Sequence, residues 1–122
     1  MLKSLVEHHI ALIRRFGDDE FEEFSLLFLK LDSGINIDVK KSIQIIFRES
    51  DLLFEYDEHF ILLLPKTGWN GAVTLLNGLQ KFLNQEFKDA IITFPDDGDN
   101  VEKLLTNFAN MVNKTYHIDI RF

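Results

Sequence analysis

The sequence predicts a single α/β domain of the α+β type, with helices flanking a central, mostly antiparallel five-stranded sheet. Its 122 residues are enough for one domain with a substantial core. A hydrophobic content of 46% beside 27% charged residues is typical of a globular protein. Apolar residues recur with a helical period in some segments and with a strand-like pattern in others. No linker, repeat or low-complexity segment divides the chain, so residues 1–122 form one domain.

The first half of the chain predicts a helix, a strand and a second helix. Residues 1–20 contain an amphipathic helix, and Gly17 can take the left-handed conformation that closes it. Residues 24–31 are apolar almost throughout and too few for a good helix, which indicates a central strand buried on both faces. A turn at 32–34 precedes a second helix with an apolar stripe formed by Val39, Ile43, Ile46 and Phe47.

A hairpin and a third helix follow. Residues 52–56 and 60–64 are short apolar runs separated by Asp57, Glu58 and His59, which is typical of two strands joined by a turn. Pro65 ends the second of these strands because it cannot donate to a ladder. The helical period of the next apolar residues then predicts a helix over 72–83.

The last elements are a strand, a helix and a final strand. Residues 90–94 predict a strand that ends before Pro95. Asp99 with Glu102 resembles a capping box and opens a helix over 101–112. Residues 116–122 alternate polar and apolar, which predicts a half-exposed strand. The inner part of this order, βαββαβ, is the ferredoxin-like arrangement, extended by an N-terminal helix and a C-terminal α-β unit.

Charge and composition exclude several classes of function. The net charge of −7 repels phosphate backbones and anionic lipid, so we expect neither nucleic acid nor a membrane surface as a partner. The chain has no cysteine, which excludes disulfides and thiolate metal sites. It has no signal-peptide core, and no apolar run approaches the ~20 residues of a membrane helix, so the expected location is cytoplasmic.

Residues 47–72 contain a distinctive series of motifs: Arg48 and Asp51, a predicted hairpin before Phe60, and Leu-Leu-Pro at 63–65 followed by Ala72. This series resembles the GGDEF, or diguanylate cyclase, domain. The family's pattern in this region is an Arg-x-x-Asp, a strand, the Gly-Gly-Asp/Glu-Glu-Phe hairpin, a strand ending in Leu-Leu-Pro, and a helix with an early alanine. The predicted order of elements over nearly the whole chain also agrees with the family's.

The resemblance implies a chemistry for the family. Two GTP-loaded domains face each other and make cyclic di-GMP. The hairpin glycines let the backbone approach the nucleotide closely. The hairpin acid and an aspartate at the end of the first strand bind Mg²⁺, a hard cation that prefers carboxylate and phosphate oxygens.

This sequence departs from the family at the positions that carry the chemistry. With Phe60 and Leu-Leu-Pro aligned, Tyr56 and Asp57 replace the two glycines, Glu58 stands at the metal-binding acid, and His59 replaces the acid after it. Lys30 occupies the metal-ligand position of the first strand, and its ammonium would repel Mg²⁺. The following segment is also shorter than the family's. The resemblance therefore implies that this chain is not an enzyme, with no catalytic residue, no metal and no cofactor.

Two hypotheses follow from this comparison. Lys30 could pair with Glu58 and take the place of the metal's charge, or with Asp57 if the hairpin register differs by one residue. Arg48 and Asp51 match the family's inhibitory site, which binds cyclic di-GMP through guanidinium contacts. The simpler interpretation of the second pair is that Arg48 closes a helix and Asp51 caps a turn.

Other motifs have structural interpretations. Gly-Asp-Asp-Glu-Phe at 17–21 has the letters of the family name, but it follows a helix and indicates a cap and an acidic turn. The histidines lack metal-ligand spacing. Asp96–Asn100 resembles a fragment of a calcium loop without the remaining ligands, and indicates a turn.

The sequence as a whole favours a catalytically inactive GGDEF-like signalling module that regulates by binding a protein partner or cyclic di-GMP. Two alternatives stay open. One is a divergent nucleotide cyclase or other nucleotide-binding enzyme, against which Lys30 argues. The other is an oligomerisation module, such as a homodimer formed through a sheet edge or the first helix.

Overall fold

A four-stranded antiparallel sheet organises the computed structural model, with the strand order β2-β3-β1-β4. Its strands are β1 (Phe24–Leu29), β2 (Leu52–Tyr56), β3 (His59–Pro65) and β4 (Ile91–Phe94). Its helices are α1 (Leu2–Phe16), α3 (Trp69–Leu83) and α4 (Val101–Tyr116). The structure describes residues 2–16, 23–30, 41, 52–56, 59–83 and 86–121, and every structural statement below concerns these residues.

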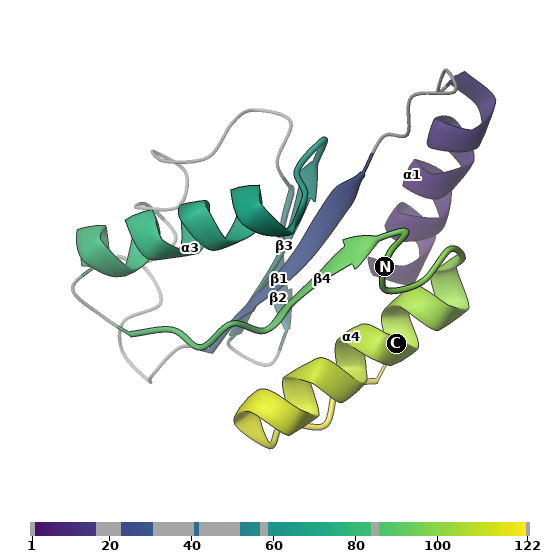
Figure 1. Ribbon diagram of the computed structural model, residues 1–122. Helices are drawn as coiled ribbons and strands as arrows, with labels where there is room; N and C mark the ends of the chain where they lie inside the picture. The colour runs from purple at the N-terminus through teal and green to yellow at the C-terminus, as the bar shows by residue number, and fades with distance from the viewer. Residues whose placement is uncertain are drawn as a thin grey trace.

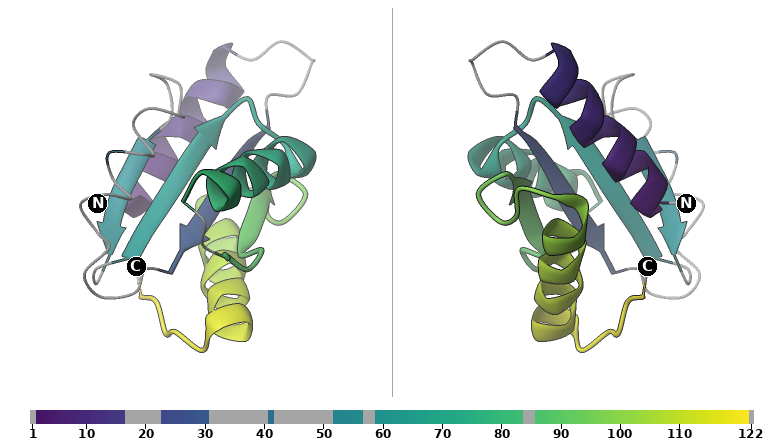
Figure 2. Two further views of the ribbon diagram at one scale, coloured as in Figure 1. Left: turned by 90° about the vertical axis from the view of Figure 1, so that its left-hand side faces the viewer. Right: turned by 90° about the vertical axis from the view of Figure 1, so that its right-hand side faces the viewer.

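The helices form a layer on each face of the sheet. Helix α3 covers one face, and α1 and α4 cover the other (Figure 1; Figure 2). Strand β1 supplies side chains to both layers, because alternate residues of a strand point to opposite faces. Phe24, Leu26 and Phe28 pack with α1 and α4, whereas Leu27 and Leu29 pack with α3. The strand predicted to be buried on both faces is thus confirmed, with all its residues buried.

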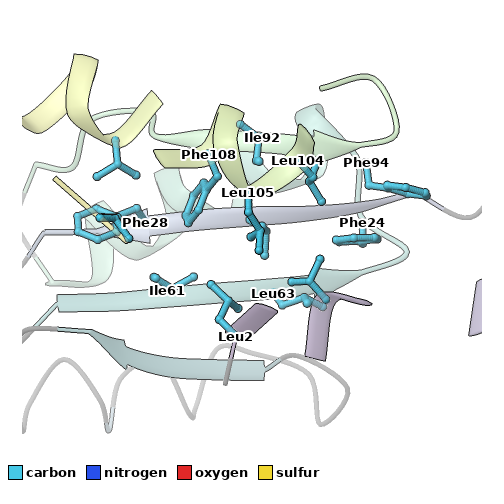
Figure 3. Packing of buried hydrophobic residues seen from close by; sticks show 14 of the residues in the cluster. Leu2, Phe24, Phe28, Ile61, Leu63, Ile92, Phe94, Leu104, Leu105 and Phe108 are labelled. Carbon is cyan, nitrogen blue, oxygen red and sulfur yellow. The ribbon is translucent and has the colours of Figure 1, made fainter. Parts of the chain in front are cut away.

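Aromatic and aliphatic side chains fill the layer between the sheet and α4. Figure 3 shows Phe28 of β1 and Phe108 of α4 within this cluster, together with residues of β3 and β4. The rings of Phe24 and Phe94 stack across the β1–β4 pair with their centroids 5.0 Å apart. Apolar rings bring large buried area without polar atoms that would need partners, which explains how so short a chain covers both faces.

The N-terminal helix is part of the same domain core. Its residues Leu2, Val6, Ile10 and Ile13 are buried against the sheet and α4. At its other end, Nη2 of Arg14 donates a hydrogen bond of 2.5 Å to the backbone oxygen of Asp99, just before α4. None of the helices in the described ranges is long and apolar enough to cross a membrane.

Most of the predicted elements are confirmed, with shifts of one to a few residues at their ends. The start of α4 is one correction, because its N-cap is Asn100 and not Asp99. The side-chain oxygen of Asn100 accepts a hydrogen bond of 2.9 Å from the backbone nitrogen of Lys103. Asp99 instead forms an exposed ion pair with the Lys103 side chain at 3.6 Å. The predicted second helix lies outside the described residues apart from helical Lys41, so the full ferredoxin-like path stays a prediction.

The predicted fifth strand is wrong for the described part of the C-terminal segment. Residues 117–121 have no regular structure, and the described sheet has four strands. Helix α4 continues to Tyr116 and closes at His117, which takes a left-handed conformation with φ 58°. The chain then crosses the α1 and α4 side of the sheet, where Ile120 is buried and the backbone nitrogen of Arg121 donates to the Tyr56 hydroxyl at 3.1 Å. The alternating pattern reflects this packing and not strand pairing.

Two glycine-to-alanine substitutions should have opposite effects on stability. Gly98 has φ 152°, and a Cβ there would lie 2.6 Å from the backbone nitrogen of Leu104 in the first turn of α4. We expect Gly98→Ala to lower the free energy of unfolding by about 1–3 kcal/mol, because the clash is with backbone and the conformation disfavours a side chain.

Gly78 is the matched control, since it lies inside α3 and a Cβ there would meet nothing within 4 Å. Gly78→Ala should raise the free energy of unfolding by about 0.5–1 kcal/mol through helix propensity. Chemical denaturation of both variants measures the difference. A Gly98→Ala variant as stable as the parent would contradict the geometry.

Candidate functional site

The candidate site lies where β1 ends beside the β2–β3 hairpin. In the sheet register Leu29 pairs with Phe60, and Tyr56 pairs with His59. Lys30 directly follows Leu29, so continuing the register by one residue places Lys30 opposite His59. Four residues singled out from the sequence, Lys30, Tyr56, His59 and Phe60, therefore meet at one end of the sheet.

The remaining predicted site residues lie outside the described residues. Asp57 and Glu58, which separate Tyr56 from His59 in the sequence, are among them, so a pair between Lys30 and either acid stays a prediction. Arg48 and Asp51, the inhibitory-site-like pair, are also outside the described ranges. Their position next to the start of β2 follows from the sequence alone, because β2 begins at Leu52.

The four residues that meet have different environments. Lys30 is exposed, and it makes no ion pair with any residue in the described ranges. Phe60 is fully buried under α3. Tyr56 packs against the opposite cluster, and its hydroxyl holds the C-terminal segment through the hydrogen bond to Arg121. Tyr56 is thus a packing residue in this chain, and its ring occupies space that a glycine would leave open.

The ring of Phe28 links the hairpin to the end of α4. Its centroid lies 5.5 Å from that of the His59 ring and 5.8 Å from that of the Tyr116 ring. Phe28 itself is fully buried, whereas His59 and Tyr116 are half-buried. Both half-buried rings therefore rest on one buried phenylalanine at this end of the sheet.

The backbone of Lys88 is held at the same end by Tyr116. The Tyr116 hydroxyl accepts a hydrogen bond of 2.7 Å from the Lys88 nitrogen and donates one of 3.1 Å to the Lys88 oxygen. The Nζ of Lys88 lies 5.9 Å from the centroid of the Tyr116 ring. Sequence reasoning missed both residues, because their contact spans 28 positions. The signal that could have located Lys88 is its even spacing with Ala90 and Ile92, which face the same cluster.

Burial raises the pKa of the Tyr116 phenol above its ordinary value of 10.0. The negative charge of Asp89 raises this pKa further, whereas the hydrogen bond to the Lys88 backbone lowers it. The neutral phenol is thus the form that the folded chain favours, which suits a group that both donates and accepts a hydrogen bond.

The described residues do not assemble a carboxylate metal site. No group of three or more histidine, aspartate or glutamate residues within the described ranges could hold a metal ion. Lys30 stands at the position where the family resemblance places a metal ligand. Its ammonium group has only hydrogen-bond donors, so it cannot coordinate a metal ion. The described part of this end can bind anions, π systems and hydrogen-bond acceptors.

The raised pKa of Tyr116 predicts a loss of stability at high pH. Because the folded-state pKa lies above the unfolded value, the contribution of the phenol is complete below pH 10 and is lost as the pH rises through the folded-state pKa. The free energy of unfolding of the parent should therefore fall more steeply above pH 10 than that of Tyr116→Phe. Denaturant titrations of both proteins at neutral and alkaline pH measure this. Parallel curves for the two would contradict the assigned environment.

One comparison with known proteins bears on this arrangement. The chain is similar in structure to a truncated form of TpbB (also called YfiN) from Pseudomonas aeruginosa that comprises only the GGDEF domain. The TM-score is 0.70, and the match covers 93% of this chain and 82% of that one at 14% sequence identity. No protein-family model and no curated protein matches the sequence. The part of the resemblance that concerns fold is thereby confirmed: this chain has the fold of a GGDEF domain.

Proposed function

We propose that this chain is a catalytically inactive GGDEF-like module that regulates by binding, either to a protein partner or to cyclic di-GMP. The observation that carries the proposal is the exposed ammonium of Lys30, at the end of β1 beside the hairpin, in a chain with the GGDEF fold. The family resemblance places an Mg²⁺ ligand at this position. A cation there repels Mg²⁺, and the side chain supplies no oxygen atom that could coordinate the ion.

The hairpin supports the same proposal. Tyr56 stands where the resemblance places a glycine, and its ring packs into the core while its hydroxyl binds Arg121. Replacing a glycine by a packed tyrosine removes the open backbone that a nucleotide could approach. His59 replaces an acid and rests on Phe28. Tyr56 therefore serves packing at a position where the family's chemistry needs open backbone, which supports a function in binding without catalysis.

Binding of cyclic di-GMP and binding of a protein partner would place different requirements on the chain. Cyclic di-GMP binding would depend on Arg48 and Asp51, whose residue types match the family's inhibitory site. A protein partner requires no particular motif. The divergent-cyclase alternative requires carboxylates from other positions to replace the Mg²⁺ ligand, and a homodimer would be one form of the protein-binding version.

We expect no cyclase activity from this chain. Incubation with GTP and Mg²⁺ should yield neither cyclic di-GMP nor pyrophosphate above the rate without protein. Lys30→Asp should also stay inactive, because Tyr56, Asp57 and His59 still occupy the hairpin. Product formation is followed by chromatography, with an active diguanylate cyclase as the positive control. Turnover by the parent chain would overturn the proposal of inactivity.

Calorimetric titration separates the two binding versions. Saturable binding of cyclic di-GMP that Arg48→Ala abolishes would identify a receptor. The matched control is Arg15→Ala, which removes an exposed arginine from α1 and should leave binding unchanged. Absence of binding in the parent chain would leave the protein-binding version.

A further inference from the structure

Two lysines and a histidine from three parts of the chain lie near Phe28. Lys30 follows Phe28 by two residues, so the alternation of β1, carried one residue past its end, assigns both to the face of α1 and α4. The His59 ring lies 5.5 Å from the Phe28 ring. Lys88 is connected to Phe28 through Tyr116. The Nζ of Lys88 lies 5.9 Å from the centroid of the Tyr116 ring, and that centroid lies 5.8 Å from the centroid of the Phe28 ring. Figure 1 shows the end of β1, the segment before β4 and the yellow end of α4 on one side of the molecule.

The sheet register fixes how close two of these groups lie. Leu29 and Phe60 form the last pair of the β1–β3 ladder, so extending the register by one residue places Lys30 opposite His59. Directly opposed residues on one face have Cβ atoms about 4.5–5.5 Å apart, within reach of a single small ligand group. Lys88 approaches from the β4 side, and the two hydrogen bonds between its backbone and the Tyr116 hydroxyl keep it there. The three residues form a row across the end of the sheet, called the cation row below after its two lysines.

The positive charge of the cation row comes from the ammonium groups of Lys30 and Lys88. Lys30 has no ion-pair partner in the described ranges, although the chain as a whole carries −7. Asp89 lies near enough to Tyr116 to raise the pKa of its phenol, and it is the closest described acid in sequence to Lys88. Asp119, on the C-terminal segment, is already paired with Arg121 at 3.3 Å. The hairpin acids Asp57 and Glu58 are the natural competitors for Lys30.

The surroundings of the row favour an oxyanion. Lysine ammonium groups donate to phosphate oxygens as point charges, and such charge-assisted hydrogen bonds are stronger than neutral ones. The buried ring of Phe28 and the half-buried ring of Tyr116 lie beside the row, and apolar rings that exclude water from one side strengthen a charge-assisted contact. A carboxylate at the Lys30 position would need a metal ion between itself and a phosphate, whereas an ammonium contacts the phosphate directly.

We propose that the cation row of Lys30, His59 and Lys88 binds the phosphate group of an anionic ligand directly, without a divalent cation. This inference rests on the proposed function, since it assigns the ligand chemistry of the same degenerate site. In the family, by resemblance, Mg²⁺ helps to bind the nucleotide at this position, whereas the proposed contact needs no metal ion.

Inorganic pyrophosphate in the presence of a chelator is the probe. Calorimetric titration should give saturable binding, and addition of excess Mg²⁺ in place of the chelator should not strengthen it. Lys30→Gln and Lys88→Gln should each raise the dissociation constant at least about tenfold, the effect of losing one charge-assisted contact. Both side chains are exposed, so both variants should keep the parent's circular dichroism spectrum.

Lys81→Gln is the matched control, because Lys81 is an exposed lysine near the end of α3, the helix that covers the opposite face of the sheet. Its dissociation constant should equal that of the parent. Equal weakening by Lys81→Gln and Lys30→Gln would show attraction to overall charge and would overturn the proposal. The proposal also fails if pyrophosphate binds only with Mg²⁺, or only after Glu58→Gln, since the native hairpin would then neutralise Lys30.

Failure of this proposal is distinguishable from failure of the proposed function. Turnover of GTP would overturn the inactive module whatever pyrophosphate does. Absence of metal-free binding would overturn the cation row and leave the inactive module intact. Cyclic di-GMP binding that depends on Arg48 but not on Lys30 would likewise separate the inhibitory-site-like pair from the row.

Discussion

The fold depends on a six-residue strand that is buried on both sides. Strand β1 pairs with β3 along one edge and with β4 along the other, and its side chains feed both helical layers. Its one polar residue, Ser25, is satisfied inside the sheet, because its hydroxyl donates to the Thr67 oxygen at 2.7 Å and lies 3.1 Å from the Thr93 hydroxyl. Burial ends abruptly at Lys30. The candidate site is therefore where the most buried strand of the described sheet emerges into solvent.

The far edge of the sheet explains how α4 reaches that site. The backbone nitrogen of Thr93 donates to the Asp97 carboxylate at 2.8 Å, and the nitrogen of Asp97 donates back to the Thr93 oxygen at 2.8 Å. These bonds cover outward-facing groups of the edge strand β4, which would otherwise invite pairing with another chain. They also set the turn that leads into α4, and Asn107 donates to the Asp97 oxygen from the second turn of that helix. The direction of α4 fixed here brings its last residue, Tyr116, over Phe28 at the other end of β1.

The local sequence pattern was sufficient to predict the helices that bury one apolar stripe and the strands that form one apolar run. The apolar run of β1, the hairpin over 52–65 and the three described helices all have periods that the packing confirms. The C-terminal segment was wrongly predicted as a strand because Ile118 and Ile120 alternate with exposed residues. Both isoleucines pack into the cluster on the α1 and α4 side of the sheet, but their backbone has no regular structure. Nothing near His117 in sequence indicates its left-handed turn. In the site, the family resemblance located Lys30 and His59. The spacing of Lys88 with Ala90 and Ile92 indicates at most its face of the sheet, and its contact with Tyr116 joins segments too distant for local pattern to specify.

The charge of Lys30 is the point at which the proposed function departs from the fold that this chain shares with GGDEF domains. At 14% identity the likeness to the TpbB domain concerns backbone arrangement, and arrangement alone does not set chemistry. The pairing of β1 with β3 places the end of β1 beside the β2–β3 hairpin. The fold therefore sets the location of the site, and the residues at that location set its chemistry. A carboxylate at that place attracts a metal and, through it, a nucleotide. In the function proposed here, an ammonium at that place repels the metal and attracts the phosphate itself, so the proposal keeps the location of the site and gives up the metal that catalysis needs.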